Sequence, residues 1–185
     1  SGVIEFEDSE KKDSATAIKK LKQRGIHCVM LTGDRSEIAE TFGESFGITE
    51  VHAEVLPSEK AEIISRYQDR GEIVAMVGDG INDAPALTQA DVGIALGTGT
   101  DIAMESGDIV LVKGDLAGVV RTAILAEATF KKIKQNLFWA FIYNVVAIPL
   151  AFLGLLHPVI AEGAMALSSI NVVWNSNRLR KTHLS

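Results

Sequence analysis

The sequence predicts an α/β fold, a parallel doubly wound sheet followed by a pair of apolar helices, and three observations support this prediction. In the first 135 residues, short apolar runs alternate with charged amphipathic segments, which is the rhythm of strands and helices in a parallel sheet. Polar side chains directly follow two of these runs, at the sheet edge where α/β proteins bind ligands. Between Asn136 and Asn175, by contrast, the one formally charged side chain is Glu162.

The helices predicted in the front part either end at a glycine or begin with a proline or acidic residues. The first, 9–24, places Ala15, Ile18 and Leu21 on one face and stops at Gly25. The remaining predicted helices are 36–46, 57–70 and 83–89, with a helical turn at 100–105. The predicted strands are 26–31, 51–53, 73–77, 92–95 and 109–112.

Composition limits the classes of function. The chain has 185 residues, 47% of them hydrophobic, and a formal net charge of -6, which argues against a nucleic-acid partner. Its one cysteine, Cys28, excludes an internal disulfide and a cysteine metal cluster. Because Cys28 lies in an apolar run, we interpret it as a small buried hydrophobe and not as a reactive thiol.

The run 78–87 reads Gly-Asp-Gly-Ile-Asn-Asp-Ala-Pro-Ala-Leu and follows a predicted buried strand. Gly78 and Gly80 remove side-chain bulk, so that the backbone can approach a ligand closely. The carboxylates of Asp79 and Asp83 are oxygen ligands of the kind that Mg²⁺ uses together with substrate phosphates. The ordinary alternative is a Gly-Asp-Gly turn followed by an Asn or Asp that caps the next helix.

Two further loops are predicted at the same edge of the sheet. Thr32, Gly33 and Asp34 follow the first strand, and Lys60 lies at the start of a helix. Phosphoryl transfer needs hydrogen-bond donors and a positive charge on the phosphoryl oxygens, with a metal to neutralise them. These residues supply those groups, although each alone is also typical of a turn or of a solvated helix start.

The apolar tail predicts a transmembrane hairpin. Residues 137–156 are long enough, at 1.5 Å per residue, to cross a hydrocarbon core of about 30 Å, and 158–174 form a second span. Lysines precede the pair and basic residues follow it, whereas the turn between the spans has no Lys or Arg, so both ends are predicted to face the cytoplasm. The alternative is a pair of buried core helices in a soluble protein.

Each span carries a polar face. Asn136, Tyr143 and Asn144 share one face of the first, and Pro149 is expected to kink the helix beyond them. Polar residues within membrane spans usually face the bundle interior and mark an ion path.

In the second span, Met165, Ser168 and Ser169 share a face, and Glu162 lies one turn earlier. A thioether is a soft ligand that suits Cu⁺, although a gap-filling methionine and helix-packing serines would give the same pattern.

The run 78–87 resembles the hinge motif of the P-type ATPases, a branch of the haloacid dehalogenase-like phosphotransferases. The resemblance implies a partial phosphorylation domain with that fold, in which Asp79 and Asp83 hold Mg²⁺ while Thr32 and Lys60 contact the phosphoryl group. It also implies catalytic roles for Gly33, Asp34 and Asn82, and cofactor binding by Gly78 and Gly80.

The polar faces of the tail resemble the last two membrane helices of the heavy-metal (CPx-type) P-type ATPases, specifically the monovalent-copper exporters. Zinc-exporting relatives carry an acidic Asp-Gly-type motif in the last helix, which this sequence lacks. The resemblance implies a Cu⁺ path lined by Tyr143, Asn144, Met165, Ser168 and Ser169, with Glu162 as a further candidate.

The resemblance also implies that the chain is the C-terminal segment of a pump, with a phosphorylation domain over 1–130 and a hairpin over 131–185. The nucleophilic aspartate, in a run like Asp-Lys-Thr-Gly-Thr, is not found here, so the chain alone is not expected to hydrolyse ATP. The implied cofactors are Mg²⁺ and ATP, with Cu⁺ as substrate.

The implied partners are the actuator and nucleotide-binding domains, the remaining membrane helices, a copper chaperone and membrane lipid. The implied location is the plasma membrane, as a multi-pass protein with a cytoplasmic phosphorylation domain. Three alternatives stay open: a P-type exporter of Ag⁺, Cu²⁺ or Zn²⁺, a membrane-anchored phosphatase of the haloacid dehalogenase class, and a noncatalytic membrane regulatory fragment.

Overall fold

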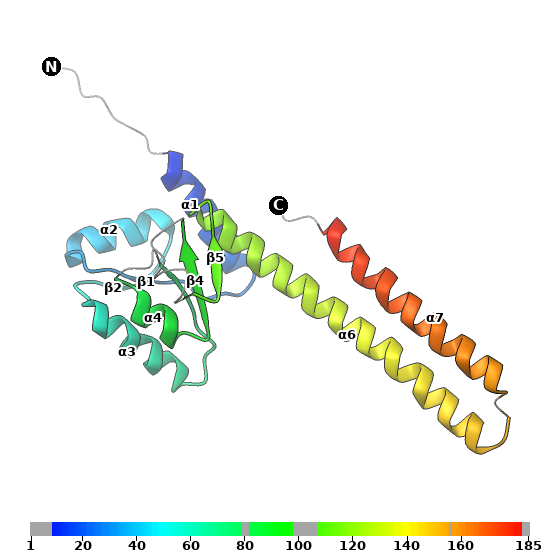
Figure 1. Ribbon diagram of the computed structural model, residues 1–185. Coiled ribbons are helices and arrows are strands. Elements are labelled where there is room, and N and C mark those ends of the chain that lie inside the picture. The colour runs from blue at the N-terminus through cyan, green and yellow to red at the C-terminus, as the bar shows by residue number, and fades with distance from the viewer. Residues whose placement is uncertain (1–8, 79–81, 98–106, 156, 183–185) are drawn as a thin grey trace. The chain divides into compact units, whose positions relative to one another are not determined.

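The computed structural model describes residues 9–78, 82–97, 107–155 and 157–182, and the chain divides into two compact units, Ser1–Val120 and Arg121–Ser185 (Figure 1). The predicted domain boundary at residue 130 stays a prediction. In chain order the first unit contains α1 (Ser9–Gln23), β1 (Val29–Leu31), α2 (Ser36–Phe46), β2 (Glu50–His52), α3 (Pro57–Gln68), β3 (Ala75–Gly78), α4 (Ala84–Gln89), β4 (Val92–Leu96) and β5 (Ile109–Leu111). Helix α6 (Leu116–Phe152) begins in the first unit and continues into the second, which also holds α7 (Pro158–Asn177) and the 3-10 helix η1 (Arg178–Lys181).

The predicted parallel α/β class is confirmed, and every described strand pair is parallel. The ladder hydrogen bonds of the described residues group the strands into two sheets, β1-β2 and β3-β4-β5, where the sequence predicted one. Leu31 of β1 nevertheless packs against the hydrophobic cluster formed by α3, β3 and α4. The two sheets therefore contribute to one core.

That core is centred on the short helix α4. Ala86 and Leu87 are fully buried there and pack with Ile64 of α3 and Met76 of β3. Burial of these side chains fixes the start of α4, and with it the end of the loop that joins β3 to α4.

Several predicted elements are shorter in the structure, and for two of them the local reason is clear. The strand predicted from residue 26 begins at Val29, because Gly25 turns the chain with a φ of +79° and the Ile26 N–H donates to the Leu21 carbonyl. Helix α3 ends at Gln68 and not at residue 70, since the chain turns at Gly71 with a φ of +83°. The turn predicted at 100–105 lies outside the described residues.

The long helix α6 begins at Leu116 and runs on without a break into the first predicted apolar span. Among the described residues, it is the helix that is long and apolar enough to cross a membrane. It continues through Pro149 to Phe152, and Gly154 then turns the chain with a φ of +71°. Helix α7 ends at Asn177, three residues beyond the predicted span.

Candidate functional site

The structure brings Lys60 and Asp83 together across 23 residues of sequence. Lys60 lies on the first turns of α3 and Asp83 precedes α4, and the Lys60 Nζ donates to the Asp83 Oδ1 at 2.6 Å. Both side chains are largely buried, with 14% and 13% of their surface exposed. Asp83 occupies the N-cap position of α4 but makes no capping bond with its side chain. Its carboxylate is therefore committed to Lys60, unlike that of a simple helix cap.

Gly78, the last residue of β3, makes room for this carboxylate. A Cβ atom placed on Gly78 would lie 2.6 Å from the Asp83 Oδ2 and 2.8 Å from the Asp83 Cβ. No real side chain tolerates such distances, so the aspartate can lie against the strand end only because residue 78 is glycine. Asp79 and Gly80, the other predicted residues of this loop, lie outside the described residues, and Asn82 is exposed.

Thr32 and Asp34 form a hydrogen-bonded turn at the end of β1. The Thr32 hydroxyl donates to the Asp34 Oδ2 at 2.9 Å and accepts the Asp34 N–H at 3.1 Å. A Cβ atom on Gly33 would make only ordinary contact, 3.6 Å from the Val55 carbonyl. The turn therefore depends on the Thr32 hydroxyl and the Asp34 carboxylate, whereas a side chain at position 33 would fit.

The loop after β2 connects this turn to Lys60. The Glu54 N–H donates to the Asp34 carbonyl at 2.9 Å, and the Val55 N–H donates to the Thr32 carbonyl at 3.0 Å. The next residue, Leu56, is the N-cap of α3, the helix that carries Lys60. One loop thus fixes both the hydroxyl turn and the start of the lysine helix.

Sequence reasoning missed the role of Glu54. It holds a left-handed backbone with a φ of +56°, a conformation that is uncommon outside glycine. A glutamate in a polar segment gives no signal of such a conformation, so this contribution could be found only in the structure.

The residues present fit a magnesium ion. The described residues hold no group of three His, Cys, Asp or Glu side chains that could enclose a metal. Mg²⁺ usually needs no such cage, since it is held by one or two carboxylates together with water and substrate phosphates. Asp83 supplies one such carboxylate, and its Oδ2 lies on the side of Gly78, away from the bond that Oδ1 accepts from Lys60.

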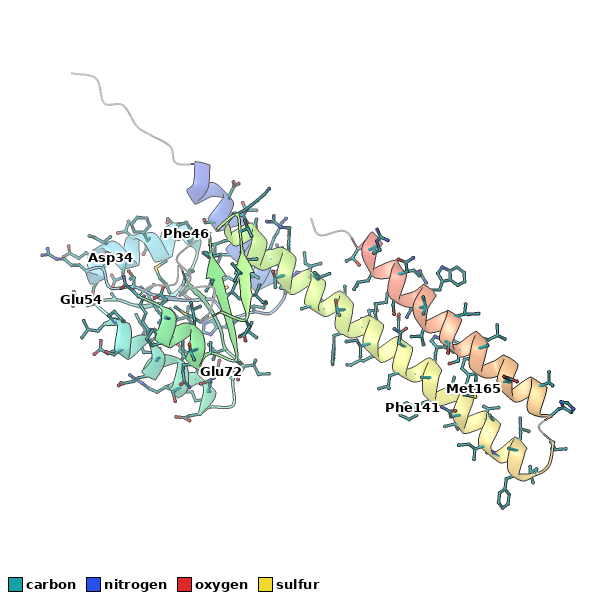
Figure 2. All side chains as sticks on the ribbon, in the orientation of Figure 1. Asp34, Phe46, Glu54, Glu72, Phe141 and Met165 are labelled. Atoms are coloured by element: carbon teal, nitrogen blue, oxygen red, sulfur yellow. The ribbon has the colours of Figure 1, made fainter. Side chains whose placement is uncertain are left out.

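The candidates for the membrane path bond within their own helices. The Asn144 Nδ2 donates to the Ala140 carbonyl at 2.9 Å, and the Ser169 hydroxyl donates to the Met165 carbonyl at 3.2 Å. Met165 itself, labelled on α7 in Figure 2, is 69% exposed.

The other residues predicted to line the membrane path are half-buried or exposed. Tyr143 is half-buried and its ring lies 6.4 Å from that of Trp139, one turn away. Ser168 is half-buried and Glu162 is exposed. Among the described residues, no hydrogen bond joins the side chains of these candidates to one another.

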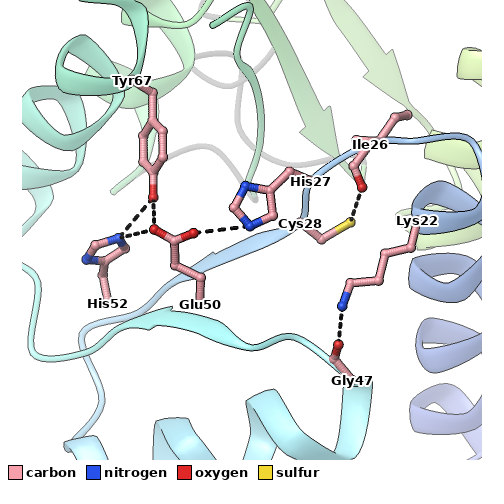
Figure 3. A network of polar contacts seen from close by, with 8 residues as sticks. All are labelled: Lys22, Ile26, His27, Cys28, Gly47, Glu50, His52 and Tyr67. Atoms are coloured by element: carbon pink, nitrogen blue, oxygen red, sulfur yellow. Dashed lines mark hydrogen bonds and ion pairs between the residues drawn. The ribbon is translucent and has the colours of Figure 1, made fainter. Parts of the chain in front are cut away.

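A second polar network, which the sequence analysis did not predict, joins β2 to α3 (Figure 3). The Tyr67 hydroxyl donates to the Glu50 Oε1 at 2.5 Å and lies 3.2 Å from the His52 Nε2, while the His27 Nε2 lies 3.1 Å from the Glu50 Oε2. The bond from Tyr67, aided by both histidines, lowers the pKa of Glu50. Burial, followed by the bond to Glu50, raises the pKa of Tyr67 to about 12. The alternation of Glu50 and His52 on one strand face was the available signal.

Comparisons with known proteins agree with this architecture. The family model of haloacid dehalogenase-like hydrolases matches residues 1–91. The chain is 54% identical over 184 residues to a copper-exporting P-type ATPase of Staphylococcus epidermidis, a match that covers 100% of this chain and 23% of the relative. It is 53% identical over 184 residues to a probable copper-importing P-type ATPase A of Enterococcus hirae, covering 98% of this chain and 25% of the relative.

A solved structure supports the same assignment. The crystal structure of a zinc-transporting PIB-type ATPase in its E2.Pi state matches with a TM-score of 0.84 and 37% identity, over 90% of this chain and 27% of that one. The chain thus spans about a quarter of the length of the curated relatives it matches. At this identity over the whole chain, the chain belongs to the heavy-metal branch of the P-type ATPases.

Proposed function

We propose that the chain forms part of an ATP-driven pump that exports Cu⁺ from the cytoplasm through an aspartyl-phosphate intermediate. The nucleophilic aspartate would come from outside this chain, as would the actuator and nucleotide-binding domains and the other membrane helices. The single observation that supports this proposal best is the buried Lys60–Asp83 pair, packed against a strand end that only glycine can occupy.

In this mechanism the first unit binds and neutralises a phosphoryl group. Lys60 donates to a phosphoryl oxygen, and the Thr32 hydroxyl, once its proton turns away from the Asp34 carboxylate, donates to another. When bound, Mg²⁺ neutralises the charge of the phosphoryl oxygens. Asp83 would hold it, together with Asp79, while Gly78 and Gly80 leave the loop backbone close to the ligand.

In the membrane the substrate would meet soft and neutral ligands. The Met165 thioether suits Cu⁺, and the side chains of Tyr143, Asn144, Ser168 and Ser169 complete the path, with Glu162 as a further candidate at one end. We further propose a multi-pass location in the plasma membrane with the phosphorylation domain in the cytoplasm, and delivery of Cu⁺ by a copper chaperone.

Acid-gel detection of a phosphoenzyme tests the proposal. The complete pump is purified in detergent and given radiolabelled ATP with Cu⁺, with Zn²⁺ or with a chelator. A label that depends on Cu⁺ is the expected result. A label that depends on neither metal, or no label at all, would overturn the copper pump and favour a noncatalytic fragment.

A second candidate function is export of another soft or transition metal, such as Zn²⁺ or Ag⁺. The observation that favours it is the match to the zinc-transporting ATPase at a TM-score of 0.84. The Zn²⁺ arm of the phosphoenzyme assay, with an added Ag⁺ arm, separates these substrates. Because the relatives include an exporter and a probable importer, uptake of copper into inside-out vesicles with ATP is the measurement of direction.

A further inference from the structure

A cluster of neutral amides, a hydroxyl and one lysine joins α6 to α7 near one end of the hairpin. The Lys132 Nζ donates to the Asn175 Oδ1 at 2.9 Å, and the Asn136 Nδ2 donates to the Ser176 Oγ at 2.8 Å. The Asn175 Nδ2 donates to the Asn136 Oδ1 at 2.8 Å and to the Gln135 Oε1 at 3.3 Å. We call this cluster the amide clasp.

The amide clasp saturates Asn175. Both hydrogens of its amide nitrogen and its carbonyl oxygen have partners, all of them on α6. Lys132, Gln135 and Asn136 lie at i, i+3 and i+4 of that helix, on one face. The contacts of Asn175 are therefore specific to one axial and rotational setting of the two helices.

The helices have little else that sets their register. The described bonds of Asn144 and Ser169 stay within one helix, and the apolar side chains of α6 and α7 are largely exposed. Apolar surfaces slide past one another in lipid at small cost, whereas a hydrogen bond fixes position. At 1.5 Å per residue, Asn144 lies about 12 Å along α6 from Asn136, and Ser169 lies about 9 Å along α7 from Asn175.

We propose that Asn136 and Asn175 are positioning residues that set the register of α6 against α7, so that Tyr143 and Asn144 face the level of Met165 and Ser169. This inference rests on the proposed Cu⁺ path. The residues of the amide clasp are not among the proposed Cu⁺ ligands, so their effect on copper must be transmitted through the helices.

Three variants of the complete pump test the amide clasp. Asn136→Leu and Asn175→Leu keep side-chain size but remove the bonds. Asn136→Asp keeps an acceptor for the Asn175 amide and can accept from the Ser176 hydroxyl in place of donating to it. Asn177→Asp is the matched control, since Asn177 is an exposed asparagine at the end of α7.

Backbone hydrogen exchange at 130–137 and 173–178 is measured together with Cu⁺ affinity and phosphorylation from inorganic phosphate. Both leucine variants should exchange at least fivefold faster at these segments and bind Cu⁺ about tenfold more weakly, with phosphorylation retained. Asn136→Asp and Asn177→Asp should match the unchanged pump. The double leucine variant should be no worse than either single variant, because the cluster acts as a unit.

The outcomes separate the two proposals. Faster exchange in the leucine variants with unchanged Cu⁺ affinity would overturn the positioning role. If Asn136→Asp exchanged as fast and bound Cu⁺ as weakly as Asn136→Leu, the hydrogen bonds of the amide clasp would not be what sets the register. If the pump without any substitution binds no Cu⁺, the proposed function is overturned. In that case the exchange of the leucine variants still reports on the amide clasp.

Discussion

The two candidate sites differ in where their polar side chains find partners. In the first unit, Lys60 and Asp83 bond to each other across 23 residues of sequence and are largely buried. In the second, Asn144 and Ser169 bond to carbonyls of their own helices, and Met165 is exposed.

The difference shows which site this chain builds by itself. A charge can be buried only when it is paired, so the fold of the first unit must bring Lys60 and Asp83 together before any ligand arrives. A polar side chain in a membrane helix can instead be satisfied by the carbonyl one turn back. The membrane candidates are therefore satisfied within their own helices, and changes at the two sites should have different consequences.

The largest effect is expected from Asp83→Asn in the complete pump. The amide keeps the shape of the side chain but leaves the Lys60 ammonium without an anionic partner and removes the proposed carboxylate ligand for Mg²⁺. Phosphoenzyme formed from ATP should fall by about 100-fold or more, which is about 2.7 kcal/mol in the barrier. The measurement is the rate of label incorporation on acid gels.

Asp91→Asn is the matched control for that change. The Asp91 carboxylate also accepts hydrogen bonds, from the Val74 N–H at 2.8 Å and from the Gln68 Nε2 at 3.2 Å, but it precedes β4 and forms no ion pair with any of the described residues. Its phosphoenzyme should form at a rate close to that of the unchanged pump. Equal loss in both variants would mean that the Asp83 result reflects folding and not the site.

Gly78→Ala should give the next largest effect, on stability. The new methyl group would lie 2.6 Å from the Asp83 Oδ2, so either the carboxylate or the end of β3 must move. We expect the free energy of unfolding to fall by about 1–3 kcal/mol, measured by urea denaturation.

Gly33→Ala is the contrasting substitution, since its methyl group would meet only the Val55 carbonyl at 3.6 Å. It should cost less than about 1 kcal/mol. If both alanines were equally tolerated, the close packing of Gly78 against Asp83 would be refuted.

Met165→Val should weaken Cu⁺ binding and leave the phosphorylation reaction unaffected. Because the Met165 side chain is exposed in this chain, its loss removes the proposed soft ligand without opening a cavity. Cu⁺ affinity of the complete pump should fall about tenfold, or about 1.4 kcal/mol, while phosphorylation from inorganic phosphate is retained.

Leu167→Val provides the comparison for a change of apolar bulk on the same helix, since Leu167 is 62% exposed. It should leave Cu⁺ affinity unchanged. If Met165→Val also left the Cu⁺ affinity unchanged, Met165 would be an ordinary packing residue and not a copper ligand.

The smallest effect is expected from Tyr67→Phe, which removes the hydroxyl from the network of Glu50 and His52. The stability cost should be about 1 kcal/mol near neutral pH. The pKa of Tyr67 is raised from 10.0 to about 12, so the folded state favours the protonated phenol. That contribution is fully present below pH 10 and is lost as pH rises toward 12.

The pH dependence distinguishes this network from simple packing. The unchanged protein should lose stability between pH 10 and 12 more steeply than Tyr67→Phe does, in denaturation measured across that range. In addition, the variant should show a higher pKa for Glu50, because the bond from Tyr67 is the largest cause of its lowered value. Identical pH profiles would contradict the bond.

The sequence by itself determined the class of the fold and most of its elements. Alternating apolar and amphipathic segments need no partner to be recognised, and neither does an apolar run long enough to span a bilayer. The site residues of the first unit were predicted as types, since a hydroxyl, an ammonium and carboxylates at strand ends have a recognisable chemistry. Their roles in catalysis stay proposals.

The tertiary structure decided which of these groups meet. No pattern in the sequence states that Asp83 bonds to Lys60 and leaves α4 without a side-chain cap, or that Glu54 adopts a left-handed backbone to hold the Thr32 turn. The division of the strands into two sheets and the amide clasp were also invisible from the sequence, and the alternation of Glu50 and His52 was the one signal of the Glu50–Tyr67 network. Each depends on distances between segments far apart in the chain, which are fixed by packing, whereas local propensity reports only on neighbours in sequence.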